Sequence, residues 1–462
     1  MKKILGALTL ALAGCATGPA YQTPSAPLSA QFKEAEGWQP AAPADLLEKG
    51  PWWELFGDAT LNQLASQVDV NNQNVAAAQA RYAQARAAVA EQRASLFPVV
   101  TLDASANRSG SGSSGAGGDG RTGNQYRVNI GASWEPDVWG RLRAGVSGAQ
   151  AGAQASAADL AAARLAAQGE LAANYIGLRL SDAQLALLGE TVAGYQRVLQ
   201  ITQNRVNAGV APSSDLLQAQ TQLANASADR LSAQRQRAQL EHAIAILLGK
   251  APADFTLAAA PWTLQVPQIP LGLPSTLLER RPDIAAAERR VAAANTQIGI
   301  ARSAYFPSLS LGGSYGVAGS QLGGLFSASN TLWSLGLSAA QAVFNAGATG
   351  ARVDQASAAR DVAVANYRQA VLTALADVED QLAASKVLAQ QQALRETSAH
   401  AASQVEQQML NRYRAGQVGY TDVVAAQVTA LNARRALLQA QADRQSTAVA
   451  LVQALGGGWK GF

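Results

Sequence analysis

Residues 126–134 read Tyr-Arg-Val-Asn-Ile-Gly-Ala-Ser-Trp, and the rest of the architecture can be inferred from this segment. Apolar residues occupy every second position and polar or small residues lie between them. That period is typical of a β-strand with one apolar and one polar face. The run has about nine residues, which is the length that crosses a bilayer as a tilted strand. The segment therefore predicts a membrane-spanning strand.

Three further segments have the same period, so that the chain contains two strand hairpins. They are residues ~99–107, ~308–317 and ~331–339, and Gly/Ser-rich loops join the members of each pair. A soluble β-sandwich whose sheets each have one solvent-exposed face would give the same alternation. Four strands in two hairpins hardly make a sandwich, so we favour strands that lie in lipid.

A very long proline-free stretch follows each strand hairpin. Residues 140–207 and 347–414 are rich in Ala, Gln, Leu and Arg, which are strong helix formers. At about 1.5 Å per residue each helix would be roughly 100 Å long, which far exceeds a globular domain. Apolar residues at alternating steps of three and four, clearest from Leu185 to Val206, predict coiled-coil packing.

Both long helices are expected to end in a sharp turn and to be followed by a returning helix. The turns are predicted at Gly209 and Gly416, because glycine ends helices well. The returning helices are expected at ~213–249 and ~420–456. Shorter helices, at ~74–96 and ~283–305, precede the strand hairpins.

The whole arrangement occurs twice along the chain. Arg205, Asp215 and Phe97-Pro98 recur as Arg412, Asp422 and Phe306-Pro307, about 207 to 209 residues further on. Such a constant offset indicates an internal two-fold repeat. We divide the chain into a signal peptide at 1–14, an N-terminal extended or equatorial segment at 15–73, repeat 1 at 74–249, a proline-rich linker at 250–280, repeat 2 at 281–456 and a C-terminal tail at 457–462.

The first fifteen residues have the composition of a bacterial secretion signal. Lys2-Lys3 is followed by a short apolar run and then by Leu12-Ala13-Gly14-Cys15. The apolar run is too short to span a membrane as a helix. The last four residues resemble a lipobox, which predicts a diacylglycerol, and with it palmitate, on Cys15. An ordinary signal with an incidental cysteine is the alternative. Ala16, rather than an aspartate, after the cysteine favours transport to the outer membrane.

The composition argues against several other classes of protein. The net charge is +4, and two of these charges belong to Lys2 and Lys3, so nothing indicates a nucleic-acid partner. A single cysteine excludes an intramolecular disulfide, and two isolated histidines nearly exclude a metal site of the His type. Catalysis needs a convergent set of titratable groups. We therefore expect no enzyme activity, no metal and no cofactor apart from the lipid on Cys15.

Four strands cannot close a barrel, and an open sheet edge in lipid leaves backbone groups unpaired. Several chains must therefore share one barrel. Eight strands would leave an interior filled with side chains, whereas twelve strands from three chains would leave a wider lumen. The polar strand faces would line this lumen, and the long helices would continue it as a tube. The fold class expected is therefore a mixed α+β membrane protein in which an antiparallel coiled-coil helical barrel is continuous with a transmembrane β-barrel.

Four motifs support this interpretation through a resemblance. The chain is similar to the outer-membrane efflux protein family, the TolC-like channels, and within it to the lipoprotein (NodT-type) branch of RND-type multidrug efflux channels. The matching motifs are Pro51–Asp58 (PWWELFGD), Trp134–Arg141 (WEPDVWGR), Leu277–Ile284 (LLERRPDI) and Tyr305–Leu309 (YFPSL). The resemblance implies a homotrimer with twelve strands and twelve periplasmic helices, held in the outer membrane. It also implies a periplasmic adaptor (membrane fusion) protein and an inner-membrane RND-type pump as partners.

The resemblance also implies a gate at the periplasmic hairpin tips. The family usually has an acidic residue before the Ala-Gln pair of the second tip, and here that position is Ala425. We expect Thr421, Asp422 and Ala425 to lie near the closed end, with Asp422 making polar contacts that keep it shut. The alternative is that Asp215 and Asp422 only stabilise the N-termini of the returning helices.

The function expected is the exit channel of a tripartite multidrug efflux system, through which drugs or other small molecules pass passively to the exterior. A duct for type I polypeptide secretion has the same architecture and is the nearest alternative. A periplasmic adaptor would have one helical hairpin between β-rich halves, and the two hairpins of this sequence argue against it.

Overall fold

The computed structural model describes residues 18–35, 51–110, 122–262, 266–267, 269 and 280–459, so the predicted signal peptide and Cys15 lie outside the described residues. The chain forms two compact units. The first, here called the strand unit, comprises the chain up to Ser25, Arg81–Ser156 and Ala287–Tyr367. The second, the hairpin unit, comprises Ala26–Ala80, Ala157–Ala286 and the chain from Arg368 onwards. Each unit contains segments of both repeats, so the repeats do not fold as separate domains.

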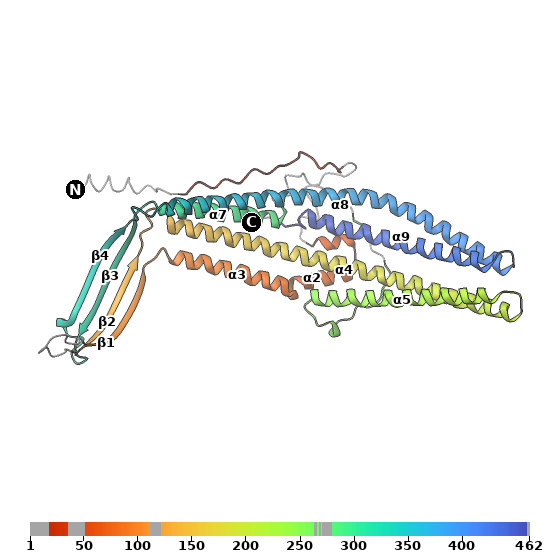
Figure 1. The fold of residues 1–462 in the computed structure, drawn as a ribbon, viewed down its shortest axis with the longest axis horizontal. Helices are drawn as coiled ribbons and strands as arrows, with labels where there is room; N and C mark the ends of the chain where they lie inside the picture. The colour runs from red at the N-terminus through yellow and green to blue at the C-terminus, as the bar shows by residue number, and fades with distance from the viewer. Residues whose placement is uncertain are drawn as a thin grey trace. The chain divides into compact units, whose positions relative to one another are not determined.

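The strand unit contains one antiparallel sheet of four strands. They are β1 (Val99–Gly110), β2 (Thr122–Trp134), β3 (Ser308–Gly319) and β4 (Thr331–Ala340), in the order β1-β2-β3-β4 (Figure 1). All four strands lie at the predicted places, although β2 begins four residues earlier than expected. The pairing of β2 with β3 joins the hairpin of the first repeat to that of the second.

The register of the sheet confirms the predicted division into two faces. Leu102, Ile130, Tyr315 and Trp333 are direct partners across the four strands. The adjacent row is Thr101, Gly131, Ser314 and Ser334. Because successive side chains of a strand point to opposite faces, these two rows lie on opposite sides of the sheet. One face therefore carries large apolar side chains, and the other carries small and mostly polar side chains.

Six helices correspond to those expected from the sequence. The short ones are α3 (Gln73–Ala94) and α7 (Pro282–Ser303), the long ones α4 (Arg141–Asn207) and α8 (Ala348–Arg414), and the returning ones α5 (Ser213–Leu247) and α9 (Tyr420–Ala454). Each begins and ends within two residues of its predicted bounds. No helix in the described part of the chain is both long and apolar enough to cross a bilayer.

The N-terminal segment, expected to be extended or equatorial, contains helices. It contains a 3-10 helix, η2 (Trp52–Phe56), and an α-helix, α2 (Ala59–Asn71). Asp58 starts α2, because its carboxylate accepts hydrogen bonds from the backbone N–H groups of Thr60 and Leu61 at 2.8 and 3.0 Å. Short 3-10 helices, η3 (Pro252–Asp254) and η5 (Ala328–Asn330), also lie in the linker and in the β3–β4 loop.

Buried ion pairs within the hairpin unit hold the described start of the linker against α4 and α5. The carboxylate of Asp182, which is 3% exposed, accepts from Arg179 at 2.9 Å and from Arg237 at 2.6 Å. The Arg179 guanidinium also donates to the carbonyl of Ala258 at 2.9 Å. These charges are paired and hydrogen-bonded, as buried charges must be. These bonds fix the position of the first residues of the linker. Every residue that forms them belongs to the hairpin unit.

Candidate functional site

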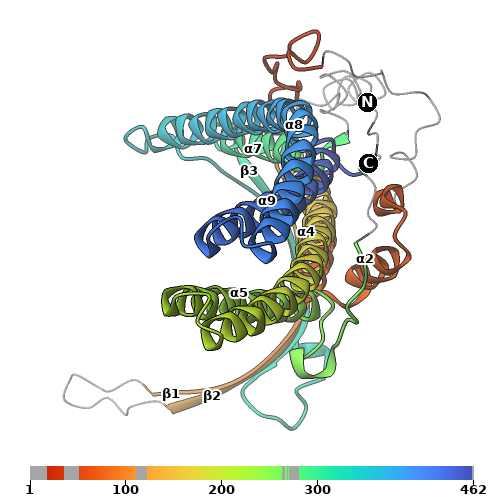
Figure 2. The same cartoon turned by 90° about the vertical axis from the view of Figure 1, so that its right-hand side faces the viewer.

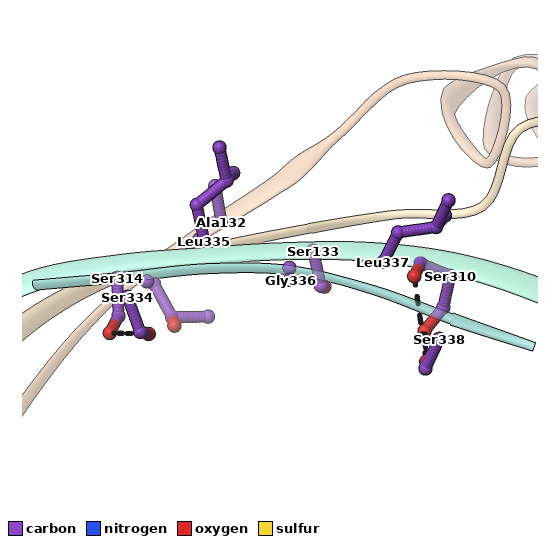
Figure 3. Close-up of a pocket in the computed structure, with 13 residues that line it drawn as sticks. Ala132, Ser133, Ser310, Ser314, Ser334, Leu335, Gly336, Leu337 and Ser338 are labelled. Atoms are coloured by element: carbon purple, nitrogen blue, oxygen red, sulfur yellow. Dashed lines mark hydrogen bonds between the residues drawn. The ribbon is translucent and has the colours of Figure 1, made fainter.

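The polar face of the sheet is a surface of small hydroxyl side chains. The hydroxyls of Ser310 and Ser338 lie 2.8 Å apart, and so do those of Ser314 and Ser334. Figure 3 shows these serines pointing to one side of the sheet and Leu335 and Leu337 pointing to the other. Asp103 and Arg127 are the charged residues of this face among the described strand residues. The face is therefore hydrophilic without a strong charge of either sign.

The opposite face exposes large apolar side chains to a degree that is unusual in water. Leu102 is 74% exposed, Trp333 77% and Leu335 74%. A contiguous apolar surface of this kind indicates contact with lipid or with another protein. Its polar reverse side makes the sheet amphipathic in the manner of a membrane strand wall.

Both edges of the sheet are open within one chain. β1 pairs with β2 and β4 pairs with β3, and neither edge strand has a second partner among the described residues. Unpaired backbone groups on an edge strand are a template for another strand, and in hydrocarbon they have no water to bind. The sheet is therefore incomplete until β1 and β4 meet strands of other chains.

Aromatic residues gather where the strands pass into the helices. Trp139, after β2, stacks on Phe306, before β3, with ring centroids 4.8 Å apart and an angle of 21° between the rings. The Trp139 indole N–H donates to the carbonyl of Pro307 at 2.7 Å. Aromatic residues with a polar tip favour the boundary between water and hydrocarbon.

The two hairpin turns are built alike. Gly209 and Gly416 have φ angles of 71° and 74°, a conformation that costs glycine little. The N–H of the following residue returns to a carbonyl five positions earlier in each turn, as Val210 to Arg205 and Gln417 to Arg412, both at 2.9 Å. This is the Schellman arrangement, which satisfies the last carbonyl groups of a helix. The predicted roles of both glycines as turn residues agree with this geometry.

A compact cluster lies between the two hairpins close to their turns, and sequence reasoning missed it. Figure 2 views the molecule from the end at which the hairpins turn. The cluster consists of Val198, Ala219, Tyr413, Tyr420 and Val423, which are all buried and which come from α4, α5, α8 and α9.

Arg205 joins the two hairpins at this cluster. Its guanidinium donates to the carbonyl of Tyr413 at 2.8 Å and lies 4.6 Å from the centre of the Tyr413 ring. The sequence signal for this contact was the recurrence of Arg205 in the repeat and the two tyrosines that flank Gly416.

Burial raises the pKa of the Tyr420 phenol. Burial, with a smaller contribution from Glu406, also raises the pKa of Tyr195 to about 12.

The residues predicted to form the gate lie beside this cluster. Asp422 and Ala425 line an apolar groove between α8 and α9, together with Val405, Met409 and Val418. The hydroxyl of Thr421 donates to the side-chain carbonyl of Gln218 on α5, at 3.4 Å. Within the described part of one chain, the Asp422 carboxylate has no hydrogen bond or ion pair.

Asp215 and Asp422 occupy equivalent positions, in the first turns of α5 and α9. A carboxylate in the first turn of a helix interacts favourably with the helix dipole, which is the alternative role weighed for both. The described residues of one chain therefore supply none of the polar contacts expected of Asp422.

Residues 18–21 lie along α7 as a strap. Gly18 packs against Gly299 so closely that a Cβ atom on Gly299 would lie 2.9 Å from the Cα atom of Gly18. The side-chain amide of Asn295 donates to the carbonyl of Pro19 at 2.9 Å, and the Tyr21 hydroxyl bonds to the Glu288 carboxylate. From Tyr21 back to Gly18 the strap runs toward the end of α7 that leads into β3.

Comparison with known proteins gives consistent matches over nearly the whole chain. The family model described as outer membrane efflux protein matches residues 64–250 and again residues 273–457, which correspond to the two repeats. The toluene efflux pump outer membrane protein TtgC of Pseudomonas putida is 33% identical over 97% of this chain and 93% of its own length.

More distant relatives and solved structures give the same result. The cation efflux system protein CusC of Escherichia coli is 31% identical and covers 98% of both chains. The crystal structure of the outer membrane channel CmeC of Campylobacter jejuni has a TM-score of 0.90 and 25% identity, over 96% of each chain.

Proposed function

Because the chain belongs to the outer membrane efflux protein family, we propose that it is the exit channel of a tripartite efflux system. It conducts small molecules passively from the periplasm across the outer membrane. One observation carries this proposal most strongly. A four-stranded sheet with an apolar face, a small polar face and two open edges is one part of a wall around an aqueous pore.

The open edges support a homotrimer. Twelve strands from three chains pair β4 of each chain with β1 of the next, so that no backbone edge is left in lipid. The polar face then lines a lumen that hydroxyl groups keep wet, and the apolar face lies against lipid.

The partners follow from the energetics of transport. A passive duct needs a pump to drive substrate into it, and the relatives are named as the outer membrane proteins of efflux pumps and efflux systems. We infer a periplasmic adaptor and an inner-membrane RND-type pump. The channel itself performs no chemistry and holds no metal or cofactor.

The strap on α7 supports a lipid anchor at Cys15. Gly18 contacts α7 at Gly299, near the helix end at Ser303, and β3 begins at Ser308. Three residues of chain span at most about 10 Å. A lipid on Cys15 is therefore within reach of the bilayer that the strands cross. The native chain should incorporate labelled palmitate, and Cys15→Ser should not.

The hairpin turns are the proposed gate. Asp422 and Ala425 line an open apolar groove beside the buried cluster, so a contact between copies at this groove would close the end of the tube. In a planar bilayer, Asp422→Ala should raise the conductance of the closed channel. An unchanged closed state would exclude a gating role for this carboxylate.

Deletion of the protein tests the function itself. Loss of the exit channel should sensitise cells to a panel of drugs, dyes and solvents while the secretion of large proteins stays normal. The same strain carrying the native chain on a plasmid is the control. Normal drug tolerance with a loss of polypeptide secretion would instead favour a type I secretion duct.

A further inference from the structure

The internal repeat allows a contact inside one chain to predict a contact between two chains. The pairing of β2 with β3 joins repeat 1 to repeat 2 within the chain. In a closed ring the pairing of β4 with β1 of the next copy would join repeat 2 to repeat 1. This step rests on the shared barrel of the proposed function. Side chains that seal the β2–β3 junction should therefore have counterparts at the β4–β1 junction.

The junction inside the chain is sealed by the ring of Trp139 on the ring of Phe306. Trp139 lies in the connection between β2 and α4, and Phe306 lies two residues before β3. Both rings belong to the strand unit. Stacking leaves Phe306 only 38% exposed.

The corresponding positions at the sheet edges are also aromatic, and neither ring stacks on another ring among the described residues, although Phe344 lacks the indole N–H by which Trp139 donates to Pro307. Phe97-Pro98 precedes β1 as Phe306-Pro307 precedes β3. Val343-Phe344 lies between β4 and α8 as Val138-Trp139 lies between β2 and α4. A glycine with positive φ follows each connection, Gly140 at 76° and Gly347 at 84°, directly before the long helix. The connection after β4 is one residue longer, and its aromatic residue is Phe344.

These aromatic residues are as exposed as expected if a neighbouring chain covers them in the assembly. Phe97 is 67% exposed and Phe344 is 88% exposed, and Val343 beside it is 98% exposed. Aromatic rings that stack gain free energy beyond the burial of their area. We propose that Phe344 of each chain stacks on Phe97 of the next chain, and so seals the base of the β4–β1 junction with a second copy of this protein.

Cysteine cross-linking tests the contact directly. Cys15 is the sole natural cysteine, so the pair Phe97→Cys and Phe344→Cys supplies the new thiols. With an oxidant or a short bismaleimide, the double variant in native outer membranes should give covalent dimers and trimers. Each single variant should stay monomeric on a denaturing gel. The matched pair Trp139→Cys and Phe306→Cys should link within one chain and give no ladder.

A second measurement separates stacking from mere proximity. Phe97→Ala and Phe344→Ala should each lower the temperature at which the purified trimer dissociates. The double variant should lower it no further than the more damaging single change, because both remove the same contact. Additive losses would mean that the two rings do not touch.

The failure of this inference is distinguishable from the failure of the proposed function. A trimer by sedimentation that gives no cross-linked ladder overturns the stacking and leaves the rings to the bilayer interface, while the channel stands. A protein that sediments as a monomer after extraction in mild detergent overturns both the shared barrel and the contact. A ladder of cross-linked species that requires both new cysteines supports both the shared barrel and the stacking of Phe344 on Phe97.

Discussion

The sheet and the hairpin turns differ in how much of their structure one chain can complete. In the sheet, Trp333 is 77% exposed and both edges lack a second strand among the described residues. In the cluster between the hairpins, Tyr420 is 2% exposed and Val423 is completely buried. The helical hairpins are therefore stabilised by their own chain, whereas the sheet depends on lipid and on other copies.

The cause of this difference lies in the backbone. A helix satisfies its own N–H and C=O groups, so that helical hairpins need only side-chain packing from their neighbours. A strand satisfies half of its groups on each side, so an edge strand remains incomplete. Changes at the hairpin cluster should therefore act within one chain, and changes in the sheet should act through the assembly.

The largest effect is expected at the hairpin cluster. Tyr420→Ala removes a buried ring that packs on Tyr413, with centroids 5.4 Å apart, and should cost about 3–5 kcal/mol of local stability. Hydrogen exchange at the ends of α8 and α9 should accelerate accordingly, while the trimer in the membrane persists. Tyr420→Phe keeps the ring and is the control. Unchanged exchange in Tyr420→Ala would mean that the cluster does not stabilise the turns.

A smaller effect, acting on assembly, is expected on the apolar face of the sheet. Leu335→Arg should cost about 2–4 kcal/mol in each chain, because a charge on the lipid face must leave water. The fraction of protein recovered from outer membranes as trimer should fall. The neighbouring change Ser334→Arg faces the polar side and should be tolerated. Equal losses for the two variants would contradict the assignment of the faces.

The smallest effect is expected where the sheet passes into α4. Burial alone would raise the pKa of the Asp137 carboxyl, but hydrogen bonds from the N–H groups of Arg143 and Leu142 and from the Arg143 side chain outweigh burial and lower this pKa. Asp137→Ala should cost about 0.5–2 kcal/mol at pH 7 through the loss of this cap.

The pH dependence of this cap has a definite sign. Because the folded-state pKa of Asp137 lies below its ordinary value of 3.8, the contribution is present above about pH 4 and is lost as the pH falls through the folded pKa. The difference in melting temperature between the native chain and Asp137→Ala should therefore shrink below pH 4. Asp137→Asn keeps one acceptor and should give an intermediate loss. A difference in melting temperature that grew as the pH fell would contradict this role of the Asp137 carboxylate.

The elements that the sequence predicts well are those with a strict alternation or with a long proline-free run of helix formers. The alternation in residues 126–134 gave both the strand and its two faces, and the register confirms them. Helix α2 was missed because its signal is local. The capping carboxylate of Asp58 lies inside a family motif, and the buried residues of α2 do recur at helical spacing, as Leu61, Leu64, Ala65 and Val68, but over a run of only 13 residues. Contacts such as Arg205 with Tyr413 were missed because about 208 residues separate them in the chain.

The sequence by itself determined the strands, the helices, the internal repeat and the two faces of the sheet. The strands and the two faces follow from the period at which apolar residues recur, the helices from long proline-free runs of helix formers, and the repeat from residues that recur at a constant offset. Only the tertiary structure decided that both repeats contribute to each compact unit, that Trp139 stacks on Phe306, and that Tyr420 is buried among four helices. These are contacts between distant residues, and packing selects them among many arrangements that have the same periodic pattern.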